Sequence, residues 1–250
     1  MIRPSLEQRD SIRSCPEGES PVMHQRWEKL LFLHWEMDPE VIQNTLPSGL
    51  YVDTYEGKAY VGIVPFYMRN ISPRGFPAVP YLSNFLECNV RTYVHDERGV
   101  PGVWFYSLEA SRWIACKVGR TAFHLPYFWA EMKSSEGQKI NYELRRRGAG
   151  IEKVAYDYEI KSELQVSAVG SLEFFLLERY LLYARRKNDG EIFTCRVHHE
   201  PYRFCRQEGS EWSSVPCSWN GLAPISGEVA HACAADAVDV DIFAPKRHKS

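Results

Sequence analysis

The sequence predicts an α+β domain that is mostly β: a closed antiparallel barrel or sheet with a few short helices and an internal cavity. Two observations carry this prediction. Apolar runs of strand length recur at short intervals, and turn-forming pairs such as Glu56-Gly57, Arg98-Gly99 and Asp189-Gly190 separate them. A closed sheet has no exposed edges and leaves an interior that can hold a small ligand.

The sequence contains enough apolar residues to form a sizeable hydrophobic core. Of its 250 residues, 44% are hydrophobic and 13% are aromatic. Residues 1–22 are polar and lack apolar periodicity, so we expect a disordered N-terminal extension there and a single domain over residues 23–250. Met23 is an alternative start of the chain.

Charge and cysteine content narrow the classes of function. The 30 basic and 32 acidic side chains give a net charge of −2, so the sequence offers no basic surface for nucleic acid. The basic runs at 145–147 and 185–187 are interpreted as solvated loops. Seven cysteines without a C-x-x-C pair favour reduced thiols over disulfides. A homo-oligomer is compatible with the pI of 6.5.

Localisation follows from the absence of targeting signals in the sequence. No apolar stretch approaches the ~20 residues of a membrane span, and the N-terminus lacks the apolar segment of a secretory signal. We therefore expect a cytoplasmic protein without a membrane partner.

The first half of the chain is predicted to begin with a strand and a short helix. Lys29–Trp35 is an apolar run of strand length. Asp38 has the position of a helix N-cap with Pro39 at the first helical residue, and the helix should end near Leu46 because Pro47 follows.

The remaining elements are predicted from periodicity and turn residues. Asp189-Gly190 between two apolar runs is a strong hairpin signal. In chain order we expect a hairpin over Tyr51–Met68 turning at Glu56-Gly57, paired strands at Leu86–His95 and Gly102–Leu108, a helix at Ser111–Phe123, a strand at Tyr156–Ile160, a helix from Ser171 to Glu178, a hairpin of Tyr180–Arg185 with Glu191–His198, and a strand at Val238–Phe243.

One predicted strand, Leu86–His95, carries polar side chains with a period of two. Glu87, Asn89 and Arg91 share one face of the strand, whereas Cys88 and Val90 share the other. Two interpretations are open: the polar face meets water, or it faces a barrel cavity. In a cavity Glu87 would need Arg91 or another partner to stay charged, or would be protonated.

The segment Gly119–Phe128 (GRTAFHLPYF) resembles a signature of the acetoacetate decarboxylases, in which a helix carrying Gly-Arg precedes an aromatic residue, a proline and two lysines. The glutamate of that family would map to Glu87. From Met23 to about Phe243 the chain is more similar still to the uncharacterised YqjF-like family of the same superfamily. The motifs that carry this similarity are FLHW at 32–35, VPF at 64–66, NVRTY at 89–93, LPY at 125–127, ERY at 178–180 and HH at 198–199.

The resemblance implies the acetoacetate decarboxylase-like fold, but it does not imply the reaction. The decarboxylases form a Schiff base between a lysine and the ketone of the substrate. Tyr127 and Phe128 stand at the two lysine positions, the family's arginine falls at about Glu36, and the nearest amine, Lys117, has no lysine beside it. We expect no Schiff-base decarboxylation. We also expect no cofactor, because the sequence has no P-loop or dinucleotide fingerprint.

His198-His199 with Cys195 and Cys205 would be candidate zinc ligands, but strand geometry disfavours such a site. Cys195 and His199 would lie ~13 Å apart along a strand. Zinc needs its ligands within ~2.0–2.3 Å of one point. We therefore expect no metal, and we expect one histidine to face the cavity while the other stabilises the strand end.

The candidate site combines acid–base and anion-binding residues. Glu87 would be a general acid or base, and Tyr127 would donate a hydrogen bond. Arginine suits a carboxylate because its planar fork meets both oxygens. The candidate catalytic residues are Glu87 and Tyr127, and the candidate substrate-binding residues are Arg91, Arg179, Trp35 and His199.

The expected function is binding of a small oxo or hydroxy acid, and whether conversion follows stays open. A conversion would be a lyase, hydratase or isomerase step. The alternatives are a non-catalytic carrier or sensor of a small ligand and a structural or partner-binding role.

Overall fold

The computed structural model describes residues 2–79, 82–208, 212–223, 225 and 227–248. This part of the chain forms one mixed sheet of thirteen strands with five short helices. The strands are β1 (Met23–Met37), β2 (Tyr51–Val52), β3 (Ala59–Pro73), β4 (Phe85–His95), β5 (Pro101–Ala110), β6 (Tyr127–Glu136), β7 (Ile140–Arg146), β8 (Val154–Tyr158), β9 (Leu181–Arg185), β10 (Ile192–His198), β11 (Phe204–Arg206), β12 (His231–Ile242) and β13 (Lys246–Arg247). The helices are α1 (Leu6–Ser11), α2 (Pro39–Gln43), α3 (Trp113–Ala122), α4 (Leu172–Leu177) and α5 (Val215–Ser218).

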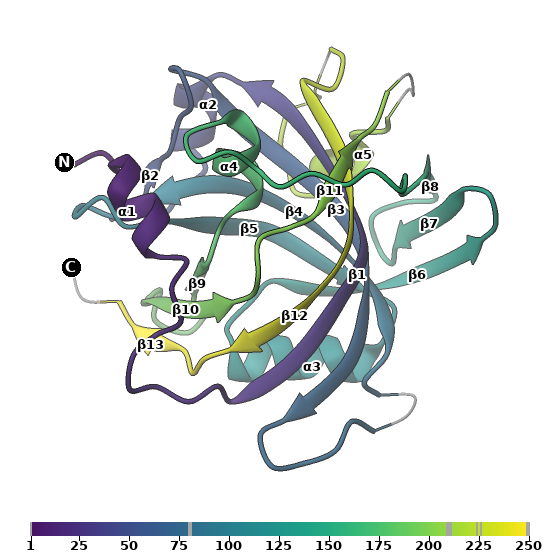
Figure 1. The fold of residues 1–250 in the computed structure, drawn as a ribbon, viewed down its shortest axis with the longest axis horizontal. Helices are drawn as coiled ribbons and strands as arrows, with labels where there is room; N and C mark the ends of the chain where they lie inside the picture. The colour runs from purple at the N-terminus through teal and green to yellow at the C-terminus, as the bar shows by residue number, and fades with distance from the viewer. Residues whose placement is uncertain (1, 80–81, 209–211, 224, 226, 249–250) are drawn as a thin grey trace.

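The sheet closes into a ring through the pairings β4–β3–β1–β12–β10–β9–β5–β4. Figure 1 shows this ring with α3 at its lower end and α4 at its upper end. The predicted closed, mostly β architecture is confirmed. One detail differs, because β5 pairs with β6 and with β9 in parallel rather than antiparallel fashion.

Strands β6, β7 and β8 form an arm that continues the sheet beyond the ring, at the right of Figure 1. Ile140, Tyr142 and Leu144 of β7 are buried in the core cluster that covers the outer side of the ring. Arg146 at the end of β7 is buried and pairs with the buried carboxylate of Glu109. The prediction of a solvated loop is therefore wrong for Arg146, because Glu109 supplies the partner that a buried charge needs.

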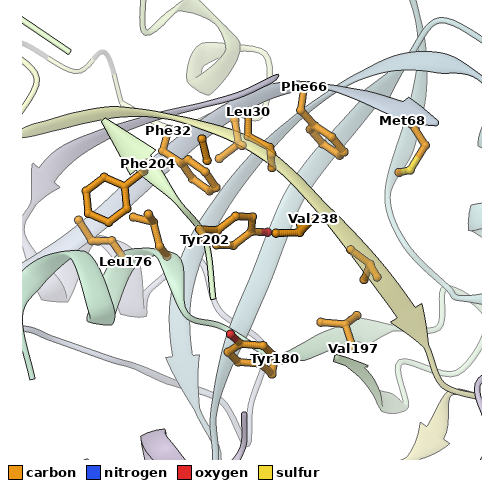
Figure 2. Packing of buried hydrophobic residues seen from close by; sticks show 14 of the residues in the cluster. Leu30, Phe32, Phe66, Met68, Leu176, Tyr180, Val197, Tyr202, Phe204 and Val238 are labelled. Atoms are coloured by element: carbon orange, nitrogen blue, oxygen red, sulfur yellow. The ribbon is translucent and has the colours of Figure 1, made fainter. Parts of the chain in front are cut away.

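Both faces of the ring strands are packed. One core cluster lies on the inner side and contains Leu30, Phe32, Phe66 and Tyr202, and Figure 2 shows Tyr202 lying among its neighbours. The rings of Phe32 and Tyr202 meet edge to face with their centroids 5.2 Å apart. A second cluster covers the outer side. Strands β1, β3, β4 and β12 therefore contribute residues to both cores.

Two residues with positive φ change which side chains of a long strand face the interior. In β1 the inward residues are odd-numbered up to Trp27 and even-numbered from Leu30, and Lys29 lies at the switch with φ 54°. Asn70, with φ 50°, marks the same switch in β3, and the β1–β3 register shifts between these segments. Such irregularities let a strand bend while it keeps apolar side chains inside.

Several predicted elements agree with the structure. The side chain of Asp38 caps α2 by accepting from the amide of Glu40, and Ser171 caps α4 in the same way. The predicted β4–β5 and β9–β10 pairs are present. No helix in the described residues is long and apolar enough to cross a membrane.

The predicted hairpin over Tyr51–Met68 is wrong in its pairing. The chain does turn at Glu56-Gly57, where both residues have positive φ. However, β2 pairs with β4, and only the bridge between Tyr55 and Lys58 joins the two arms of the turn. The turn chemistry was readable locally, whereas the choice of a distant partner strand was not.

The segment before β1, for which the sequence predicts disorder, includes helix α1, which contacts the ring. A capping box between Ser5 and Gln8 closes the start of α1. Arg9 binds both carboxylate oxygens of Asp53, and Arg196 donates to two backbone carbonyls of the segment. These contacts are ionic and backbone-directed, so apolar periodicity could not reveal them.

Candidate functional site

A cavity of about 310 Å³ lies inside the ring. It is about twice the ~150 Å³ of an engineered apolar cavity that binds benzene. Most of its wall is apolar. The polar side chains that line it are Gln25, Ser83, Glu87, Asn89, Arg91, Tyr127, Arg179, Cys195 and Tyr202.

Strand β4 provides a row of three polar groups in this wall. Glu87, Asn89 and Arg91 line the cavity, whereas Cys88 and Val90 between them belong to the outer core. Both faces of β4 are buried, so the arrangement agrees with the cavity interpretation of this strand and not with the solvent interpretation.

Glu87 lies in the cavity wall and is 2% exposed. Burial raises the pKa of its carboxyl to about 8, the hydrogen bond from Tyr127 partly offsets this, and the nearby Glu109 adds to the rise. The hydroxyl of Tyr127 donates to Oε2 of Glu87 at 2.8 Å. Arg91 is not an ion-pair partner of Glu87. Burial therefore favours the protonated form of this carboxyl.

Helix α3 and the turn after it hold Tyr127 against Glu87. The guanidinium of Arg120 donates to the carbonyl of Tyr127 at 2.7 Å, and the amide of Leu125 donates to the carbonyl of Gly119 at 3.1 Å. The Gly-Arg pair on the helix thus positions the residue that stands where the decarboxylases have a lysine.

No described residue that lines the cavity is a lysine. Lys117 is exposed on α3, with its amine over the ring of Trp113. Phe128 packs beneath the guanidinium of Arg146, whose Cζ lies 4.2 Å from the centroid of the ring. Glu36 pairs with Lys58 near the surface. The amine that a Schiff base requires is therefore absent from the described wall.

Arg91 lies at the end of the cavity beneath α4 and is 8% exposed. One terminal nitrogen donates to the carbonyl of Leu176 at 3.2 Å, and the guanidinium lies over the rings of Phe32 and Tyr93. Its Nε has no hydrogen-bond partner, and no Asp or Glu among the described residues forms an ion pair with it. The side-chain oxygen of the neighbouring Asn89 is also unpartnered there.

Arg179 lines the same cavity but is already paired. Its Nη1 donates to Asp53 at 2.8 Å and its Nε donates to the carbonyl of Phe175 at 2.6 Å, while Nη2 has no partner in the described part of the chain. Asp53 also binds Arg9, and the two arginines hold the pKa of this buried carboxyl below its usual value. Two guanidinium groups therefore share one carboxylate.

The other two sequence-predicted binding residues lie outside the cavity wall. Trp35 is buried in the outer core. His199 is buried with its ring stacked on Tyr180, 4.5 Å between centroids, and burial lowers its pKa to about 4. His198 contacts the N-terminal segment through the carbonyl of Arg13. Neither histidine is a wall residue among those described.

Sequence reasoning missed the residues that support the arginines. Asp53 and Arg9 give no local signal, because their contact spans 44 residues. Asn89 was placed on the same face as Glu87 and Arg91 by strand parity, but it was not among the candidate site residues. Metal binding has no geometric support in the described ranges, where no three His, Cys, Asp or Glu side chains are grouped to hold an ion.

The fold is that of acetoacetate decarboxylase-like enzymes. Acetoacetate decarboxylase from Legionella pneumophila superposes with a TM-score of 0.64 at 12% identity, covering 99% of this chain and 96% of that chain. An acetoacetate decarboxylase-like enzyme from Sphingomonas wittichii gives 0.62 at 12% identity, with 92% and 94% covered. The enduracididine biosynthesis enzyme MppR in complex with pyruvate gives 0.63 at 12% identity, with 91% of both chains covered.

Sequence comparison gives the family within this fold. The model of DUF2071, a family of uncharacterised conserved proteins, matches residues 24–239. The uncharacterised protein YqjF of Bacillus subtilis is 37% identical over 190 residues, which is 76% of this chain and 77% of that protein. The chain belongs to the DUF2071 family, and its predicted similarity to YqjF is confirmed.

Proposed function

We propose that this protein binds a small organic acid in its cavity, with the carboxylate held by Arg91 and with Glu87 as an acid–base group. The observation that carries the proposal is the state of Arg91. Arg91 is 8% exposed and lines a mostly apolar cavity. No carboxylate of the described residues neutralises its charge. Buried charges in proteins are normally paired, and a ligand carboxylate would supply the missing partner.

The electrostatics of the neighbouring groups support an anion. Arg9 and Arg179 share the single carboxylate of Asp53, so this cluster keeps one positive charge. Arg91 adds a second positive charge on the same side of the cavity. Apolar surroundings lower the effective dielectric constant, which strengthens the attraction between these charges and an anion.

Glu87 supports conversion of the bound acid. Its pKa of about 8 gives a proton donor at neutral pH, and Tyr127 fixes its orientation. These groups suit a lyase, hydratase or isomerase step on an oxo or hydroxy acid. The pyruvate complex of MppR supports an oxo acid by analogy of fold alone.

A carrier or sensor is the second candidate function. The mostly apolar wall with few polar groups supports retention of a ligand as well as it supports turnover. The carrier differs from the enzyme in one measurable respect: it releases the acid unchanged.

Isothermal titration calorimetry with pyruvate, lactate and butyrate tests the proposal on the wild type and on Arg91→Met. Wild type should bind at least one acid saturably, and the variant should bind it at least tenfold more weakly, since charged hydrogen bonds contribute about 1.5–3 kcal/mol. Arg147→Met changes an exposed arginine outside the wall and should bind like wild type.

Two results would contradict the proposal: no acid of any chain length binds, or Arg91→Met binds as tightly as wild type. Turnover is followed by NMR of the ligand with wild type and Glu87→Gln. Conversion that the variant loses supports the enzyme, and an unchanged ligand supports the carrier.

A further inference from the structure

We infer that the acid bound in this cavity has a long apolar body, and that a medium-chain monocarboxylate enters carboxylate first. This inference rests on the proposed function, because it takes the carboxylate to Arg91. It adds the chemical class of the rest of the ligand and the direction in which the ligand lies.

The polarity of the cavity wall changes along β4. Arg91 lies beneath α4 at one end of the strand, and Phe85 lies at the other end, six residues away. At ~3.3 Å per residue the two positions are ~20 Å apart. Glu87 and Asn89 lie between them, so the ionisable groups of this strand gather toward Arg91. Gln25 and Ser83 at the Phe85 end are uncharged, and their side chains are hydrogen-bonded to Trp27 and to the backbone of Ile71 and Val79.

The entrance at the Phe85 end is rimmed by exposed apolar side chains. Val79 and Leu82 come from the connection between β3 and β4, and Ile114 and Val118 come from α3; all four line the cavity and are 41–50% exposed. Figure 1 shows α3 at the end of the ring opposite α4. Grouped apolar side chains in contact with water mark a site for an apolar partner, and here that partner is the ligand's own tail.

The volume sets the length of the ligand. A ~150 Å³ cavity accommodates benzene, so the 310 Å³ here accommodates roughly twelve non-hydrogen atoms. A carboxylate uses three of these atoms, which leaves room for a chain close to the length of decanoate. An acid of the size of pyruvate would leave most of the apolar wall without a partner.

The test is a titration series of straight-chain acids from acetate to dodecanoate, followed by calorimetry and by the fluorescence of the protein, in which Trp27 lines the cavity. Each added methylene should tighten Kd about fourfold from butyrate to about decanoate, after which the gain should level off. Decanol lacks the carboxylate and should bind at least tenfold more weakly than decanoate.

Val118→Glu tests the entrance. A charge at the rim should weaken the binding of dodecanoate, whose tail reaches furthest toward the Phe85 end, at least fivefold and leave butyrate binding unchanged. Val166→Glu is the matched control, because Val166 is 60% exposed and lies outside the wall. Both positions are exposed, so folding should not be affected.

The outcomes separate the inference from the proposed function. If acids bind through Arg91 but Kd does not depend on chain length, the long apolar body is excluded and the proposed function stands. If no acid of any length binds, or if Arg91→Met binds the whole series like wild type, both are excluded.

Discussion

The ring of Tyr127 occupies the space beside Gly119 in which any other residue would carry its side chain. A Cβ built on Gly119 would lie 2.3 Å from Cδ2 and 2.4 Å from Cε2 of Tyr127. This contact lets the ring pack against α3 while its hydroxyl reaches Glu87. A single helical glycine therefore sets the position of the Glu87–Tyr127 pair.

Gly119→Ala is predicted to destabilise the protein by about 1–3 kcal/mol, because the added methyl overlaps a packed ring. A loss of stability would be opposite to the usual effect, since Gly→Ala in a helix ordinarily stabilises by about 1 kcal/mol. Urea denaturation measures the change. Gly137→Ala is the control, since its nearest neighbour would lie 3.8 Å away. Adding Tyr127→Ala should remove the penalty of Gly119→Ala; an equal loss in both backgrounds would contradict this explanation.

Glu87→Gln is predicted to change how stability depends on pH. The carboxyl has an ordinary pKa of 4.5 and a folded-state pKa of about 8. Between these values the folded state binds more protons than the unfolded state, so the wild-type free energy of unfolding falls as pH rises. The variant lacks this fall and should gain on wild type by at most about 1.4 kcal/mol per pH unit in the window.

Chemical denaturation at several pH values across this window measures the difference between the two proteins. Glu200→Gln, at an exposed glutamate, should follow the wild-type curve. A constant offset between Glu87→Gln and wild type across the window would show that the pKa of Glu87 is not raised.

Asp53→Asn is predicted to cost about 3–5 kcal/mol of stability, because it leaves Arg9 and Arg179 without their shared carboxylate. Asp189→Asn removes an ion pair to Arg186 at the surface, where solvent screens the charges, and should destabilise the protein far less. Thermal and urea unfolding measure both variants. Equal effects would mean that burial of Asp53 does not amplify the loss.

Arg9→Gln is predicted to release the N-terminal segment without unfolding the ring. Amides of residues 5–14 should exchange with deuterium faster, whereas amides of β12 should keep their protection. A chain that starts at Met23 should be less stable than the full chain, since it loses the contacts of Arg9 with Asp53. Fast exchange of residues 5–14 in the wild type itself would support the predicted disorder instead.

Much of the candidate site could be read from one strand. The polar residues of β4 alternate with apolar ones, so parity alone put Glu87, Asn89 and Arg91 on one face. Tyr127 came from a motif whose spacing is local. Both signals lie within ten residues of chain, which is the range in which sequence patterns reflect geometry directly.

The remaining residues of the site required knowledge of both cores. In β1 the run from Leu30 to Trp35 is apolar on both faces, so the pattern could not show that Trp35 points to the outer core. The switch of parity at Lys29 added a further ambiguity. Asp53 and Glu109 find their arginine partners only through tertiary packing, which a one-dimensional pattern does not contain.

The double burial of β4 also limits how this protein can change in length. One inserted or deleted residue within β4 would exchange its two faces, sending Cys88 and Val90 into the cavity and the polar side chains of Glu87 and Arg91 into the outer core. No substitution elsewhere would compensate, because both environments are closed. Insertions and deletions should therefore be excluded from β4, whereas the connection that follows β3 can vary in length, and with it the depth of the entrance.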